Sequence, residues 1–209
     1  MKTIFCILSL ISSTFCWAQK EFQPKGSSII QTVDGDLDGD TIPEKVIIYS
    51  TKDSGEFGDL REIQILKKVN GQWTILEKST NAILDSESGG IMGDPYSGTN
   101  IEKGILIINH FGGSSWKWAY TDKYRYQNGH FELIGHTSSS GRPGDYIKNI
   151  DFNLSTGQIN FKNEIDNTKE YGPSQKETYI KKGIKINLQN RNDKSIKIIL
   201  PKTKQEIFI

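Results

Sequence analysis

A short acidic loop carries the clearest chemistry of this 209-residue sequence. Its carboxylates alternate with other residues and end in a glutamate: Asp34, Asp36, Asp38, Asp40 and Glu44. Calcium is a hard cation that takes about six to eight oxygen ligands in proteins. Gly35 and Gly39 lie between the aspartates and let the backbone curl tightly, so that alternate carboxylates can converge on one ion. The spacing therefore predicts a calcium loop at 34–44.

Two registers of the ligands are open. If Asp34 is the first ligand, the loop begins like an EF-hand, but Lys45 then takes the twelfth position, where an EF-hand needs a bidentate glutamate. If Asp36 is the first ligand, an apolar run follows the loop at once, and we prefer this register. Its predicted ligands are Asp36, Asp38, Asp40, the carbonyl oxygen of Ile42, and Glu44.

The preferred register resembles the calcium loop of FG-GAP and VCBS-type repeats, in which a D-x-D-G-D-G-x-x-D loop leads directly into a strand. Residues 36–44 read DLDGDTIPE, so Thr41 stands where the family prefers glycine and Glu44 where it prefers aspartate. The resemblance implies a structural calcium ion. The alternatives are an acidic turn without an ion and acid–base catalysis. Catalysis is disfavoured, because paired catalytic carboxyls usually need two different environments and these all share one solvated loop.

A row of aromatic residues forms the second candidate site. Trp116, Trp118 and Tyr120 are spaced two apart, so in a strand they share one face of the sheet. Such a row could serve as a ligand platform that stacks on sugar rings or packs against a partner protein. Aromatic side chains also bury large apolar areas in sheet cores, and a core role is the preferred interpretation.

The combination of these segments resembles a family of exported bacterial proteins of uncharacterised function. The shared pieces are the GDLDGD-type loop at 35–40, a GDP-aromatic step at 93–96, and a GGSSW-basic-W segment at 112–118 that runs into an aromatic hairpin. The likeness spans residues 35–156 and implies that these parts belong to one domain. It implies no particular activity.

A hydrolase is the main catalytic alternative. Ser114 could act as a nucleophile served by His110 or His136. The residues around Ser114 lack the strand–elbow–helix context that gives a serine motif its meaning. The histidines also lack the helical spacing of zinc sites. We therefore name no catalytic residue, and keep a hydrolase acting on an envelope or extracellular polymer as the alternative function.

The elements that must position these residues are predicted to be strands. Asn70-Gly71 and Asn128-Gly129 separate β-like runs and predict tight hairpins. No window has the apolar period of a helix, although 80–85 could form one turn. Other β-like runs lie at 45–50, 62–67, 105–111, 149–154, 158–165, 184–188 and 196–200, with loops at 86–98 and 138–144. The lysine-rich stretch 176–185 is typical of a solvated sheet edge.

These runs predict an all-β domain of antiparallel sheets, sandwich-like or a partly closed barrel. A propeller-like fragment is the alternative, which the length makes less suitable. The domain is expected to span 19–209 as a single unit.

The first 18 residues are typical of a secretory signal peptide. Lys2 precedes an apolar core at 4–11, and Cys16-Trp17-Ala18 provides a small-residue cleavage site. Both cysteines, Cys6 and Cys16, fall inside this segment, so the exported chain would contain no disulfide.

Charge and hydropathy narrow the function classes. The chain has 26 basic and 25 acidic residues, which gives no excess charge to attract nucleic acid. No run after the signal has the length of a membrane span. We expect a secreted or periplasmic, calcium-stabilised binding or interaction protein, whose partner is an unknown protein or glycan.

Overall fold

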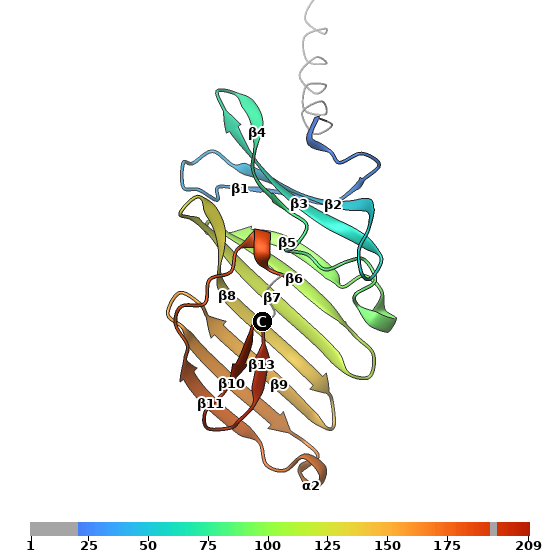
Figure 1. Ribbon diagram of the computed structural model, residues 1–209, viewed down its shortest axis with the longest axis vertical. Helices are drawn as coiled ribbons and strands as arrows, with labels where there is room; N and C mark the ends of the chain where they lie inside the picture. Colours follow the sequence, from blue (N-terminus) through green and yellow to red (C-terminus); the bar gives the residue numbers. More distant parts are fainter. Residues whose placement is uncertain (1–20, 193–195) are drawn as a thin grey trace, which may run out of the picture.

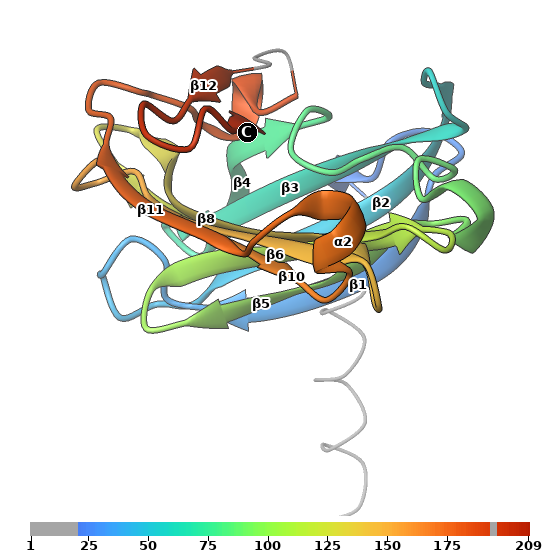
Figure 2. The same cartoon turned by 90° about the horizontal axis from the view of Figure 1, so that it is seen from below.

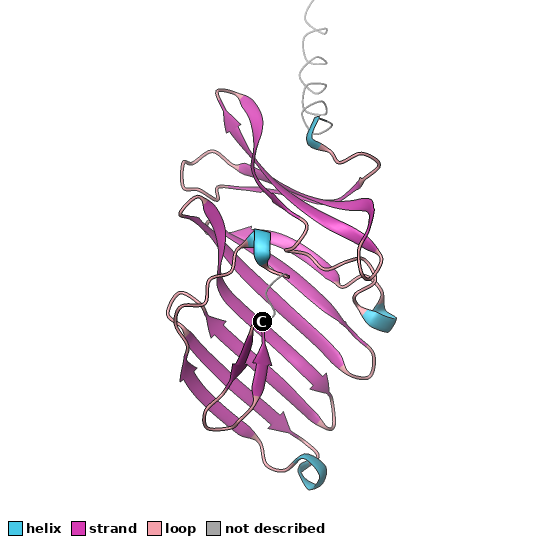
Figure 3. Ribbon diagram, in the orientation of Figure 1, coloured by secondary structure: helices cyan, strands magenta, loops and turns pink. Residues whose placement is uncertain are grey.

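The computed structural model describes residues 21–192 and 196–209. The predicted signal peptide, with both cysteines, lies outside the described residues. The described part of the chain begins close to the expected start of the domain. Strands make up 58 % of the structure and helices 6 %. The all-β prediction is therefore confirmed, and the sheets are antiparallel and do not close into a barrel (Figure 3).

Two large sheets form the body of the fold. The first has four strands in sequence order: β1 (Ser28–Gly35), β2 (Glu44–Ser54), β3 (Asp59–Val69) and β4 (Gln72–Ser79). The second has seven strands, also in sequence order: β5 (Tyr96–Glu102), β6 (Ile105–Gly113), β7 (Lys117–Gln127), β8 (His130–Arg142), β9 (Tyr146–Asn153), β10 (Gln158–Ile165) and β11 (Gln175–Ile180). Neighbouring strands therefore follow one another along the chain as hairpins (Figure 1).

The two sheets meet where β1 lies beside β5. The side-chain amide of Gln31 on β1 imitates a peptide group there. Its Nε2 donates to the carbonyl oxygen of Thr99 at 2.8 Å, and its Oε1 accepts from the Thr99 N–H at 2.9 Å. The Tyr96 hydroxyl also donates to Gln31 Oε1. The Gln31 side chain thus joins β1 to β5 by hydrogen bonds of the kind that backbone groups make within a sheet.

One hydrophobic core fills the space between the sheets and the C-terminal segment. It includes Val46 and Ile48 of β2 and Leu106 and Ile108 of β6, each at most 1 % exposed. The C-terminal segment adds Ile186, Leu188, Ile198, Leu200 and Ile207. Figure 2 shows this segment, with β12 (Lys197–Ile199), lying over one face of the seven-stranded sheet. We call that face the inner face and the opposite one the outer face.

The turn chemistry is as predicted. Asn70 and Gly71 have φ angles of 53° and 81°, and Asn128 and Gly129 have φ angles of 55° and 82°. Two successive residues at positive φ form the tight turn whose twist suits a hairpin. The lysine-rich stretch also begins in an edge strand, β11.

Several expected boundaries are wrong. The predicted strand 184–188 is extended chain that ends in a short 3-10 helix, η2 (Leu188–Asn190), because the Asn187 side chain accepts from the N–H groups of Gln189 and Asn190. The predicted loop 138–144 is mostly strand, since Ser138–Ser140 pair with both β7 and β9. The stretch 80–85 makes bends instead of a helical turn.

Strand β1 was not predicted, and it places the acidic loop between two strands instead of before the first one. Short helices elsewhere are η1 (Gly90–Met92) and α2 (Thr168–Tyr171), and β13 (Glu206–Phe208) pairs with β12. Within the described part of the chain, every helix is too short or too polar to cross a membrane.

Candidate functional site

The acidic loop connects β1 to β2 and gathers three carboxylates. Asp36, Asp38 and Asp40 each offer an oxygen, and these oxygens all lie within 4.8 Å of one another. Asp36 curls the loop by accepting from the N–H of Gly39 at 2.7 Å and from the N–H of Thr41 at 3.0 Å. The tight curl therefore brings one oxygen of each aspartate close to a common point.

Two residues in this loop adopt positive φ angles. Gly39 has φ 83°, which glycine accepts readily. Thr41 has φ 71°, at the position where FG-GAP and VCBS-type loops prefer glycine. A β-branched residue is disfavoured in this region by contact between its Cβ and the backbone. The departure noticed in the sequence thus falls at a strained turn.

Glu44 begins β2 and is completely buried. Its Oε2 accepts from the N–H of Leu37 at 2.8 Å, whereas its Oε1 has no hydrogen-bond partner among the described residues. Burial raises the pKa of Glu44, and the charges of Asp38 and Asp40 raise it further against the opposing effect of the Leu37 N–H. A buried carboxylate oxygen without a partner is costly, and a nearby cation would remove that cost.

Lys67 on β3 is the basic side chain that reaches this cluster. Its Nζ donates to Asp38 and, at 2.8 Å, to Asp40. Hydrogen bonds to Asp38 and then Asp40 raise the pKa of Lys67, and the bond from Lys67 lowers the pKa of Asp40. One ammonium therefore faces a loop with four carboxylates, and it bonds to two of them.

The two registers differ clearly in geometry. Asp34 lies within β1, and its carboxylate pairs with Lys45 at 2.6 Å instead of joining the cluster. Ile42 lies in the loop with its side chain 46 % exposed, and its N–H donates to Asp40 at 2.8 Å. The converging aspartates are thus those of the register that starts at Asp36.

The three candidate platform aromatics have different surroundings. Tyr120 stacks on His110 with ring centroids 4.6 Å apart and on Trp118 at 5.9 Å, and its burial raises its pKa. Trp116 lies in the β6–β7 turn, is 40 % exposed, and contacts the ring of Tyr146 at 5.1 Å. Arg142 lies over the Trp116 ring at 5.5 Å. Tyr120 is therefore mainly a packing residue, whereas Trp116 belongs to an exposed cluster.

A buried ionic cluster on the inner face was missed in the sequence. Asp122 of β7 is fully buried and contacts His136 Nδ1 at 2.6 Å and Arg191 Nε at 2.6 Å. Burial raises the pKa of Asp122, but Arg191 and His136 outweigh it and lower the pKa to about 2. The alternation of β7 places Asp122 between the inward-facing Tyr120 and Tyr124. An aspartate at an inward-facing position of a strand indicates that a basic side chain is buried next to it.

The candidate catalytic serine and the two candidate histidines have different surroundings. Ser114 is exposed in the β6–β7 turn, whereas His110 and His136 are 2 % and 3 % exposed. His110 Nε2 accepts from the Leu84 N–H at 3.3 Å, and burial lowers the pKa of His110 to about 4. Among the described residues, no hydrogen bond joins Ser114 to either histidine.

No protein-family model, curated protein or solved structure matches this chain. The functional argument therefore depends on the geometry of the sites above.

Proposed function

We propose that this chain is an exported, calcium-stabilised binding or interaction protein. The observation that carries the proposal is the acidic loop, where Asp36, Asp38 and Asp40 converge. Glu44, which ends the loop, has a buried Oε1 without a hydrogen-bond partner among the described residues. Carboxylate oxygens are the ligands that calcium prefers, and the ion tolerates irregular geometry. In the proposed site these four side chains and the Ile42 carbonyl oxygen hold calcium, as in the FG-GAP and VCBS-type loops that the sequence resembles.

The proposed role of the ion is structural. The loop joins β1 to β2, and β1 is the strand that meets β5 of the other sheet. An ion held by 36–44 would fix the turn between β1 and β2 and relieve the buried charge of Glu44. A ligand that binds only the folded chain stabilises it by mass action, by about 2.7 kcal/mol when its free concentration is 100 times its Kd.

An exported compartment supports this role. We propose that residues 1–18 direct the chain to the periplasm or the extracellular space, where it acts without disulfides. The alternative function, a hydrolase acting on an envelope or extracellular polymer, has less support, because His110 and His136 are buried and neither makes a hydrogen bond to Ser114 among the described residues. Binding or interaction is thus the better account of the chain.

Thermal melting with calcium and with a chelator tests the proposal. We expect calcium to raise the melting temperature by roughly 5–10 °C, given about 2.7 kcal/mol of stabilisation in a domain of this size. Asp38→Ala should abolish the shift. Asp34→Ala removes a carboxylate that pairs with Lys45 outside the cluster, and should keep it. An equal melting temperature with calcium and with chelator would refute the structural calcium site.

A further inference from the structure

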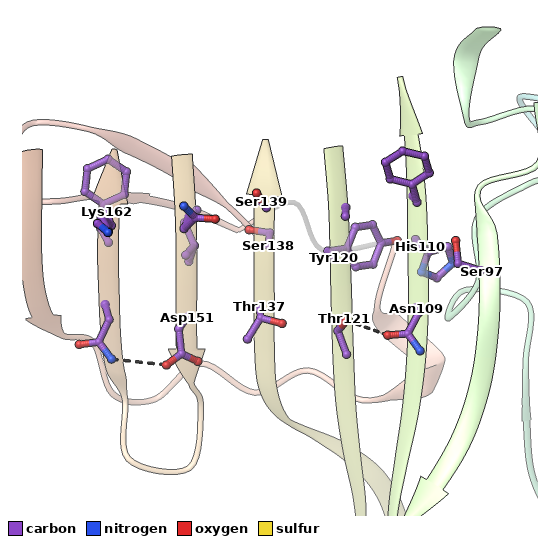
Figure 4. A pocket seen from close by; sticks show the side chains of 16 residues that line it. Ser97, Asn109, His110, Tyr120, Thr121, Thr137, Ser138, Ser139, Asp151 and Lys162 are labelled. Carbon is purple, nitrogen blue, oxygen red and sulfur yellow. Dashed lines mark hydrogen bonds between the residues drawn. The ribbon is translucent and has the colours of Figure 1, made fainter. Parts of the chain in front are cut away.

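The outer face of the seven-stranded sheet carries a shallow cleft of about 560 Å³. Its lining comes mainly from β6, β7, β8, β9 and β10, at the half of the sheet nearer the β6–β7 and β8–β9 turns. Figure 4 shows the side chains that project into it from neighbouring strands. It lies on the opposite side of the sheet from the buried ionic cluster, since residues of alternate parity in a strand face opposite sides.

The strand register arranges these side chains in two parallel rows. The first row consists of directly paired residues on five adjacent strands: Asn109, Thr121, Thr137, Asp151 and Asn160. The second row is paired in the same way: Phe111, Ala119, Ser139, Asn149 and Lys162. Adjacent strands lie about 4.8 Å apart, so the first row presents a polar group at every step across the sheet, and the second row does so from β8 to β10.

Half of the hydroxyl and amide side chains in the rows are available for a ligand. The side chains of Thr137, Ser139 and Asn149 are half-buried and make no hydrogen bond to any other described residue. Thr121 Oγ1 donates to Asn109 Oδ1 at 2.7 Å, which fixes the orientation of that amide. The cleft therefore combines oriented and free hydrogen-bonding groups.

The rows are almost free of net charge. Asp151 accepts from Asn160 at 3.5 Å, and Lys162 pairs with Glu164 at 2.6 Å, so the single acid and single base each have a partner. Farther along the same outer face the strands carry Lys123, Arg125 and Glu132. A solvated sheet face normally carries such charges for solubility. In the hollow half, uncharged polar groups outnumber the one acid and the one base, which suits an uncharged ligand.

We propose that this cleft binds a neutral oligosaccharide lying across strands β6 to β10. Hydroxyl and amide side chains offer both donors and acceptors to sugar hydroxyls. Phe111, 38 % exposed at one end of the second row, offers a ring to stack on a sugar. A protein partner would favour an apolar and aromatic centre, and a nucleic acid would favour a basic one. The inference deepens the proposed binding function and does not require the calcium site.

The test is binding of the protein to a glycan array that carries neutral oligosaccharides of glucose, mannose, galactose and N-acetylglucosamine, together with uronic-acid oligosaccharides. We expect a neutral oligosaccharide to bind. Titration of the best neutral probe should then show a loss of about tenfold in affinity for Thr137→Val, which removes one hydroxyl without changing the side-chain shape. Ser139→Tyr should fill the cleft and abolish binding.

Thr32→Val is the matched control, because it makes the same change in β1 of the other sheet and should leave the affinity unchanged. Melting of each variant shows whether it is folded. Binding of no neutral probe, binding of uronic-acid oligosaccharides only, or equal affinity of wild type and the folded Thr137→Val variant would overturn the proposal. Calcium-dependent melting is measured separately, so failure of the glycan site is distinguishable from failure of the calcium site.

Discussion

Two carboxylate clusters in this protein have opposite surroundings. On the inner face, Asp122 is enclosed by His136 and Arg191, which contact its two oxygens at 2.6 Å each. In the acidic loop, three aspartates converge, Glu44 follows them at the start of β2, and Lys67 bonds only to Asp38 and Asp40. The first cluster is neutralised by the chain itself. The second keeps an excess of negative charge and a buried oxygen without a partner.

The difference concerns what each cluster needs in order to be stable. A buried ion pair is stable when every member is paired, and removal of one member leaves an uncompensated charge. The ionic cluster of Asp122, His136 and Arg191 therefore needs only the folded chain, which connects β7 and β8 to the C-terminal segment. In our proposal, a cation from solution completes the acidic loop.

The largest expected effect is the loss of Arg191. Arg191→Met should destabilise the protein by about 3–5 kcal/mol, because Asp122 keeps its charge in a fully buried place. Lys197→Met removes one partner of an exposed pair, Lys197–Glu206 at 2.6 Å, and should cost less than about 1 kcal/mol. Denaturant unfolding of both variants measures the difference. Equal losses of unfolding free energy would show that the buried cluster contributes no more to stability than an exposed ion pair.

Acidification should lower the stability of the protein, because His110 is buried on the inner face. Its pKa is lowered from 6.5 to about 4 by burial, so the unfolded chain takes up a proton at a higher pH than the folded chain. Stability from this group is complete above pH 6.5 and is lost as the pH falls toward 4, by up to about 3 kcal/mol. His110→Gln keeps an acceptor for the Leu84 N–H and should flatten that part of the curve.

Denaturant unfolding of wild type and His110→Gln at several pH values between 6.5 and 4 measures this dependence. If His110→Gln retained the full slope, the loss of stability would have to come from other groups.

A smaller effect is expected at Lys67. Lys67→Met removes the ammonium that competes for Asp38 and Asp40, and should strengthen calcium binding by roughly fivefold. Lys45→Met removes the partner of Asp34, outside the converging aspartates, and should change the affinity less. Calcium titration calorimetry compares the two. A weaker affinity for Lys67→Met would contradict the view that Lys67 occupies part of the cation site.

Local chemistry made much of the fold predictable. The Asn-Gly turns and the alternating runs predicted the hairpins, because both signals depend on neighbours in sequence. Strand β1 and the C-terminal part of β8 were missed. Ser138–Ser140 become strand only through pairing with β7 and β9. The predicted strand at 184–188 does not form, and the Asn187 side chain instead caps the short helix η2.

The sites also differ in whether their residues are neighbours in the sequence. The aspartates of the acidic loop could be predicted because they lie within a few residues of one another. Asp122 and Arg191 are 69 residues apart, so their pairing depends on the tertiary fold. The two polar rows of the outer face were hidden for the same reason, because each row takes one residue from each of five strands.

The most direct test of the calcium site is the stability of Glu44→Gln with and without the ion. Without calcium, the change removes a buried carboxylate whose Oε1 lacks a hydrogen-bond partner, and we predict a stability equal to or higher than that of wild type. With saturating calcium, the variant loses a charged ligand, and we predict that it is less stable than wild type. Denaturant unfolding in chelator and in calcium measures both values. A variant that is less stable than wild type by the same amount in both conditions would contradict the account.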